Sequence, residues 1–419
     1  MVFVKKKTTV PVSALYMFAV WCLISMTAHA DTCLECHSEW EDNDRAPSKL
    51  ISTDVHFKAG LGCADCHGGD PTLEDMDDVR QHKNYLGVPE PEEIPLFCAG
   101  CHSNPAYMIK HNPSLSTDQF DKYKTSVHGK LLLGKGDTKA ANCVSCHSVH
   151  DIASPRIPTS TVYAVNIPTT CAECHGDAGY MAEYKIPTDQ YEKFAGSVHG
   201  IALLERNDLG APACNDCHGN HGAIPPGVTS ISAVCGLCHS LIADEFSRSP
   251  HKKAFDDLGY PECEGCHSNH LVQKPQHYWM GTSDSSICVN CHAFDDGTIA
   301  LTSAETMHKS LVDLHDAYTR AESRTNDGEL KGMMVTDLRF KLKEVKQFII
   351  KTGTAIHSFN DSVVVKTAEP GLQLANKVYE SAAAKIDEYY YRRYGLGIAS
   401  LIITMLAVLL YFKIKSIEK

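Results

Sequence analysis

The sequence predicts a mainly α-helical protein with a high loop content, which ends in a C-terminal helical hairpin or bundle and one transmembrane helix. Apolar residues at helical spacing form long stripes only after about residue 300. Before that point, turn signals such as Gly68-Gly69-Asp70-Pro71 and Ile224-Pro225-Pro226-Gly227 divide the chain into short segments. Close to the C-terminus, 18 consecutive residues carry no charged side chain.

The composition excludes several classes of protein. The apolar fraction of 43% over 419 residues rules out collagen, coiled coil and wholesale disorder. The formal charge of −12 does not support nucleic-acid binding, which needs a basic surplus. The 19 cysteines and 23 histidines are unusually many, and their spacing decides between disulfides, metal clusters and attachment of a cofactor.

Both ends of the chain carry membrane-related signals. Residues 1–30 contain three lysines, an apolar run and Ala28-His29-Ala30, so we expect a cleaved secretory signal peptide, with an uncleaved anchor as the alternative. Residues 395–412 are long enough to cross a bilayer and follow a tyrosine-rich segment, which predicts a transmembrane helix with a short cytoplasmic tail at 413–419. A buried soluble helix is the alternative. The body is then expected to be periplasmic, or outward-facing, on a single-pass C-terminal anchor.

One motif, Cys-x-x-Cys-His, occurs nine times after the signal and uses all 18 of the cysteines that follow residue 30. The cysteines are Cys33, Cys36, Cys63, Cys66, Cys98, Cys101, Cys143, Cys146, Cys171, Cys174, Cys214, Cys217, Cys235, Cys238, Cys263, Cys266, Cys288 and Cys291. The histidines that follow them are His37, His67, His102, His147, His175, His218, His239, His267 and His292.

This motif is the attachment signature of c-type haem. Two intervening residues place both sulfurs along one porphyrin edge for thioether bonds, and the next residue directs its imidazole at the iron as the proximal ligand. Zinc sites would need paired Cys-x-x-Cys units without a fixed His, and a thiol oxidoreductase would need a single pair. The sequence therefore predicts nine covalently attached haems c.

In these motifs the chain resembles the multihaem c-type cytochromes, from Asp31 to about Leu314. The resemblance implies covalent haems packed in close pairs, assembly outside the cytoplasmic membrane, and electron transfer along the haem chain. With nine haems in residues 31–300, the porphyrins should form most of the core of a nine-haem domain built of short helices and long loops.

A longer unit repeats beneath the motifs. It consists of a first motif, a [Ser/Thr]-x-His triplet, a second motif and a His three residues beyond. Complete units start at Cys98, Cys171 and Cys235, and partial units start at Cys33 and Cys288. The architecture is therefore four two-haem units plus one haem.

The histidines outside the motifs supply candidate distal ligands. Five follow first motifs and four follow second motifs, which equals the number of irons and predicts bis-histidine ligation throughout. They are His56, His128, His199, His251 and His308, and His82, His150, His221 and His270. A His three residues from its proximal ligand cannot reach the opposite face of its own porphyrin, so His150, His221 and His270 should ligate neighbouring haems. His315 could replace His308, whereas His111, His277 and His357 are interpreted as structural.

Three helical stripes follow in residues 301–394 and predict the hairpin or bundle. Turns are expected at Asn326-Asp327-Gly328 and Glu369-Pro370-Gly371. The stripes contain Met307, Leu311, Leu314 and Tyr318; Leu338, Leu342, Val345 and Ile349; and Leu374, Val378, Ala382, Ile386 and Tyr389.

Bis-histidine ligation favours low-potential haems without an open position for substrate. We expect single-electron transfer in anaerobic respiration, between a membrane quinol-oxidising partner and periplasmic or outer-surface acceptors such as other cytochromes. Two alternatives stay open: a nitrite or hydroxylamine type of oxidoreductase with one open-site haem, and a structural subunit that docks cytochromes or forms filaments.

Overall fold

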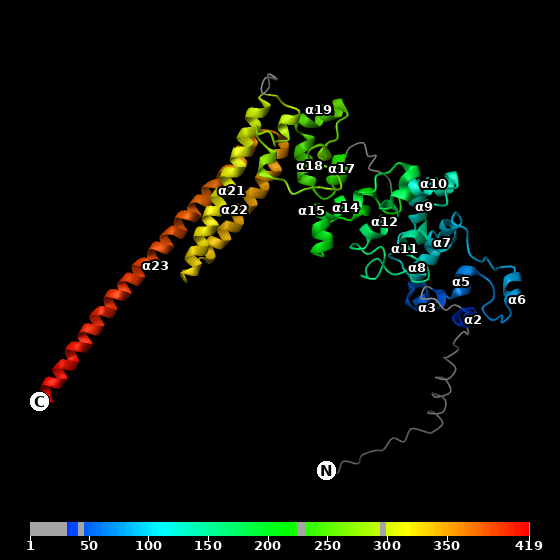
Figure 1. Ribbon diagram of the computed structural model, residues 1–419, viewed down its shortest axis with the longest axis horizontal. Helices are drawn as coiled ribbons and strands as arrows, with labels where there is room; N and C mark the ends of the chain where they lie inside the picture. Colours follow the sequence, from blue (N-terminus) through cyan, green and yellow to red (C-terminus); the bar gives the residue numbers. More distant parts are fainter. Residues whose placement is uncertain (1–31, 41–45, 224–230, 294–298, 419) are drawn as a thin grey trace, which may run out of the picture. The chain divides into compact units, whose positions relative to one another are not determined.

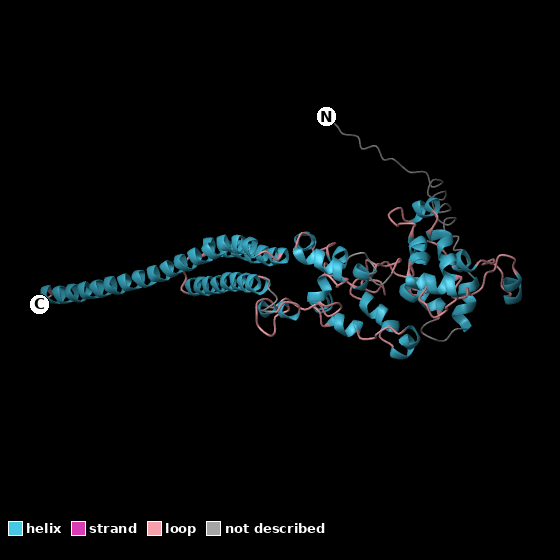
Figure 2. Ribbon diagram, turned by 90° about the horizontal axis from the view of Figure 1, so that it is seen from above, coloured by secondary structure: helices cyan, strands magenta, loops and turns pink. Residues whose placement is uncertain are grey.

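The computed structural model describes residues 32–40, 46–223, 231–293 and 299–418. The expected signal peptide at 1–30 and the expected turn at 224–227 lie outside these residues. Within the described ranges every regular element is a helix and no strand occurs (Figure 2). This confirms the mainly helical, loop-rich fold class.

The chain divides into two compact units. The first contains the residues up to Tyr191 together with Ala202–Pro225, and the second contains Glu192–Ile201 together with Pro226–Lys419. The second unit therefore holds the last three motifs as well as the long C-terminal helices. The nine-haem domain at 31–300 and the separate helical region at 301–394 stay predictions.

The first unit consists of short helices joined by loops. They are α2 (Thr32–Trp40), α3 (Pro47–Leu50), η1 (Ile51–Thr53), α4 (Val55–Lys58), α5 (Cys63–His67), α6 (Met76–Gln81), α7 (Ile94–His102), α8 (Pro105–His111), α9 (Gln119–Thr125), α10 (Val127–Lys135), α11 (Cys143–His147), α12 (Ile167–His175), α13 (Ala178–Met181), η2 (Ala182–Tyr184) and α16 (Cys214–His218). The chain passes between the units through α14 (Gln190–Ala195), α15 (Val198–Gly200) and η3 (Ile201–Glu205).

The second unit begins, like the first, with short helices joined by loops, and it ends in long helices (Figure 1). Its elements are α17 (Ile231–Cys235), α18 (Ser240–Ser247), α19 (Pro250–Leu258), α20 (Cys263–His267), η4 (His277–Trp279), η5 (Cys288–Asn290), α21 (Ala300–Leu330), α22 (Thr336–Ala355), η6 (Ile356–Ser358) and α23 (Asp361–Ile417). An apolar cluster among the short helices of the first unit buries only Tyr123, Leu132 and Ala140. A small protein core of this kind is what the predicted porphyrin-filled body requires.

Helices α21, α22 and α23 form a three-helix bundle around the main apolar core (Figure 1). Each predicted stripe supplies buried residues, for example Leu314 from α21, Leu338 from α22 and Val378 from α23. All three side chains are fully buried, and each burial contributes about 2 kcal/mol. The helical periodicity therefore identified the core-facing side of each helix.

The two turns predicted within this region are wrong. Residues 326–328 lie inside α21, and residues 369–371 lie inside α23. The chain instead turns between α21 and α22 at residues 331–335, and between α22 and α23 at residues 356–360. Gly371 is required for close helix approach, because a Cβ atom there would lie 3.0 Å from Cδ1 of Leu314 and collide with Phe348. Pro370 also lies inside this helix, at an exposed position.

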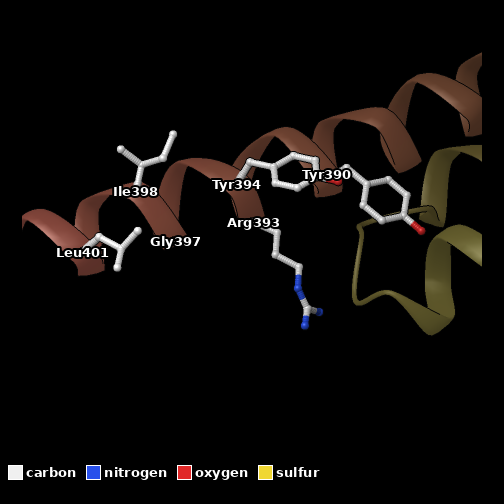
Figure 3. A pocket seen from close by; sticks show the side chains of 6 residues that line it. All are labelled: Tyr390, Arg393, Tyr394, Gly397, Ile398 and Leu401. Atoms are coloured by element: carbon white, nitrogen blue, oxygen red, sulfur yellow. The ribbon is translucent and has the colours of Figure 1, made fainter.

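Helix α23 continues without interruption from the bundle into the apolar run. Within the described residues it is long and apolar enough to cross a membrane, with a mean hydropathy of 2.3 over its most apolar window, none of which is buried. Figure 3 shows the start of this run, where Tyr390, Arg393 and Tyr394 line a hollow together with Gly397, Ile398 and Leu401. Aromatic and basic side chains at the end of an apolar helix are typical of a membrane interface.

Candidate functional site

The second motif of each pair forms a separate five-residue helix: α5, α11, α16 or α20. In three of them the residue before the second Cys caps the helix start. The backbone N–H of Gly62 donates to Asp65 at 2.7 Å, that of Asn142 to Ser145 at 3.1 Å and that of Ala213 to Asp216 at 2.8 Å. The residue after the motif His has positive φ, which ends the helix at the imidazole: Gly68, Ser148, Gly219 and Ser268.

Two of the first motifs are placed differently, at the end of a longer helix. Both α7 and α12 run for nine residues and finish at their motif histidines, His102 and His175. Each helix has a buried proline at its second position, Pro95 or Pro168, where the missing N–H would have no helical partner. These two first motifs therefore hold Cys and His at the end of a helix, whereas each second motif forms a helix of its own.

The thiols bring the two motifs of each complete unit together. The thiols of three pairs of first cysteines lie close enough to shift one another's pKa: Cys143 raises the pKa of Cys98, Cys214 raises that of Cys171 and Cys235 raises that of Cys263. This adjacency supports the interpretation of these units as pairs of attachment sites.

Consecutive repeat units also lie close to one another at their thiols. Burial raises the pKa of Cys66, Cys146 and Cys266, and nearby charges, including the thiols of the next motif, raise it further. The pKa of Cys146 rises to about 11. Those neighbouring thiols belong to the third, fifth and ninth motifs. Motifs two to six therefore follow one another as neighbours in the first compact unit of the fold, in the same order as in the chain. Motifs seven to nine do the same in the second compact unit.

Four of the five triplet histidines face first motifs in a constant register. Each lies opposite the motif His of the following repeat, not of its own repeat. The ring-centroid separations are 5.8 Å for His56–His102, 6.1 Å for His128–His175, 6.3 Å for His199–His239 and 5.9 Å for His251–His292.

Two of the four histidines after second motifs face in the opposite direction along the repeat. His150 lies 6.0 Å from His67, and His221 lies 6.1 Å from His147, with the rings inclined by 31° and 12°. Each of these therefore faces the second motif of the preceding repeat. Neighbouring repeats exchange histidines in both directions.

These separations fit an iron between two imidazoles. A metal to imidazole-nitrogen bond is about 2.0 Å, and the ring centre lies about 1 Å further, so two axial rings have centres about 6 Å apart. Burial, followed by a neighbouring imidazole, lowers the pKa of both His102 and His128. A lowered pKa favours the neutral imidazole, which is the form that binds metal.

Buried helix caps hold the triplet histidines in place. Ser126 accepts a hydrogen bond from the N–H of Gly129 at 2.8 Å and donates to the carbonyl of Tyr123 at 2.6 Å. Ser197 makes the same two bonds, with Gly200 and Phe194. The His is thus fixed at the second position of a short helix, which explains the spacing of the triplet.

A backbone hydrogen bond ties each of three triplets to the segment that follows a second motif. The middle residue of the triplet donates to the residue two positions beyond the post-motif His. These bonds join Val55 to Ile152 at 2.9 Å, Val127 to Ala223 at 3.0 Å and Val198 to Val272 at 2.8 Å. These hydrogen bonds therefore hold the segment of each triplet histidine next to the segment of a histidine that follows a second motif. His150 and His270 also share a positive φ, of 63° and 49°.

Hydrogen bonds also orient individual rings through Nδ1. The Nδ1 atom of His67 lies 2.8 Å from the carbonyl oxygen of Gly87, and that of His56 lies 3.0 Å from Asp54. Such contacts are the usual way in which proteins fix the tautomer of a metal-binding His and direct Nε2 at the metal.

The other predicted histidines lack this repeated setting. His308 lies inside α21, where Thr306 donates to Thr302 at 2.9 Å and does not cap a helix. His82 ends α6, and its Nδ1 accepts from the N–H of Asn84 at 3.4 Å. The distal partners of His37 and His218 stay a prediction from the sequence.

Two histidines interpreted as structural lie in ring pairs. His357 in η6 faces the motif residue His267 at 6.1 Å. His277 lies 5.0 Å from His315, edge to face, and neither belongs to a motif. No sequence pattern marked His357, because it stands alone between two bundle helices.

A family model matches part of the segment that carries the motifs. Residues 55–176, which include motifs two to five, match the family model for cytochrome c3. The matched segment supports a multihaem c-type cytochrome. Searches of the curated proteins and of the solved structures found no match. The repeat that begins in the matched segment continues to the motif at Cys288, beyond its end.

Proposed function

We propose that the protein is a nine-haem cytochrome that transfers single electrons, with each haem bound through one Cys-x-x-Cys-His motif and ligated by two histidines. The observation that carries this proposal is the set of ring pairs near 6 Å, in which six motif histidines each face a predicted distal histidine. The remaining three irons draw on the other histidines of the chain. Bound haem supplies a one-electron ferric–ferrous couple.

The protein's own residues serve to position and insulate this couple. Two imidazoles per iron leave no coordination position for substrate, and neutral histidine ligands favour a low potential compared with a Met/His pair. The order of the thiols supports a continuous path through neighbouring motifs within each unit. Transfer of electrons is therefore favoured over catalysis at one haem.

The body is proposed to be exported and held on the outer face of the cytoplasmic membrane by α23. The segment from Asp361 to Gly395 is helical and rises about 50 Å before the apolar run begins, at 1.5 Å per residue. The end of the bundle that carries η6 is thus distant from the start of the run. Electrons from quinol would need a membrane partner with its own redox centre, and periplasmic or outer-surface cytochromes are the proposed acceptors.

The decisive experiment combines haem quantification with spin-state analysis of purified protein. A pyridine haemochrome assay should give nine haems per chain, and low-temperature EPR of the oxidised protein should give only low-spin bis-imidazole signals. A high-spin ferric signal together with nitrite or hydroxylamine turnover would favour the enzyme alternative. Far fewer than nine haems would refute the proposal itself.

A further inference from the structure

One second motif is followed by no complete repeat that could supply a histidine opposite its own motif histidine. His67 and His147 each face a histidine from the next unit. By the same register, the motif at Cys263–His267 would need a histidine after a second motif in the unit that starts at Cys288. That unit has no second motif.

A bundle residue occupies the equivalent place. The ring of His357 lies 6.1 Å from that of His267, with an interplanar angle of 22°. The corresponding values for His147 and His221 are 6.1 Å and 12°. The separation is the one expected for two imidazoles on a common iron.

The other ring nitrogen of His357 already has partners. Its Nδ1 lies 3.2 Å from the carbonyl oxygen of Gly353 and 3.3 Å from that of Thr354. Donation from Nδ1 to these carbonyls leaves Nε2 as the atom available to a metal, as in most protein histidine–metal sites.

The turn that carries His357 also contacts the last motif. Phe359, directly after η6, has its ring centroid 3.9 Å from that of His251, which faces His292. One turn between two bundle helices thus lies against the ring pairs of the last two motifs. Because α22 and α23 are fixed by the bundle core, this turn has little freedom to move away.

We propose that His357 is the distal axial ligand of the haem attached to Cys263 and Cys266. The inference rests on the proposed function, since it requires a haem at that motif. The bundle then replaces the missing half-unit and connects the membrane-anchored helix directly to the haem array. This role belongs to a residue that has no place in the repeat.

The test is substitution of His357 in the full-length, haem-loaded protein. His357→Ala should keep the haem content of the wild type and convert about one ninth of the iron from low-spin to high-spin ferric, as measured by EPR. Added imidazole should restore the low-spin signal. His357→Met should keep the iron low-spin and raise the potential of one haem, because a thioether ligand favours the ferrous form.

Two matched variants separate this inference from its alternatives. His111→Ala removes an exposed histidine that stacks on Tyr107 and should change no haem. His308→Ala tests the bundle histidine that the sequence predicts as a distal ligand. The inference is overturned if the wild-type protein contains nine low-spin haems and His357→Ala also contains nine low-spin haems. It is overturned as well if the high-spin signal arises in His308→Ala and not in His357→Ala. A wild-type deficit of haem would instead refute the proposed function.

Discussion

The imidazole rings of His147 and His221 lie 6.1 Å apart and nearly parallel, although the two residues belong to different repeat units. His147 ends the motif helix of one unit, and His221 follows the second motif of the next. A shared iron would therefore cross-link the two repeats. Haem insertion and folding should be coupled for this reason, because neither repeat completes its own coordination.

Removal of His221 tests this cross-link. His221→Ala should convert about one ninth of the iron to the high-spin form, with the haem content unchanged, because the thioethers and His147 remain. The melting temperature should also fall, since one connection between repeats is lost. EPR spin quantification and thermal unfolding check both effects. Unchanged EPR would show that His221 does not bind iron in the protein.

The buried cap Ser126 should contribute measurably to stability. Its hydroxyl is 1% exposed and connects the N–H of Gly129 to the carbonyl of Tyr123. Ser126→Ala should cost about 1–2 kcal/mol, because the helix cap is lost and the buried N–H of Gly129 loses its acceptor. The measurement is thermal or denaturant unfolding of the haem-loaded protein. Ser283→Ala, at an exposed hydroxyl, is the control and should change stability by less than about 0.5 kcal/mol.

The sequence was sufficient for features that depend on local pattern. The nine motifs, the helical class and the apolar sides of α21, α22 and α23 all follow from spacing. The register of the ring pairs did not follow, because it depends on which repeats meet in space. The ring pair of His357 with His267 did not follow from the sequence for the same reason. The turn predicted at Gly371 was wrong because glycine also permits close helix approach, and local sequence does not distinguish the two uses. The turn predicted at Gly328 was wrong because α21 continues past it to Leu330.

The close approach at Gly371 predicts a large effect of a small substitution. In Gly371→Ala the new methyl group would collide with Phe348 and lie 3.0 Å from Leu314. Forced separation of the helices should cost about 1–3 kcal/mol. Gly353→Ala is the matched control in α22, since a methyl group there meets no atom within 4 Å. It should stabilise the helix by up to about 1 kcal/mol. Equal melting temperatures for the two variants would contradict the observed helix approach.

Truncation after Tyr394 separates the anchor from the haem-binding body. The deeply buried bundle residues of α23 end at Ile386, and the side chains of the apolar run beyond Gly395 are exposed. Loss of residues 395–419 should therefore leave the bundle intact and release the protein from the membrane. The expected result is a soluble protein with the haem content and EPR spectrum of the full chain, measured after cell fractionation. If the truncated chain stays in the membrane fraction after high-salt washing, the C-terminal run is not the principal anchor, and the N-terminal apolar segment becomes the segment to remove next.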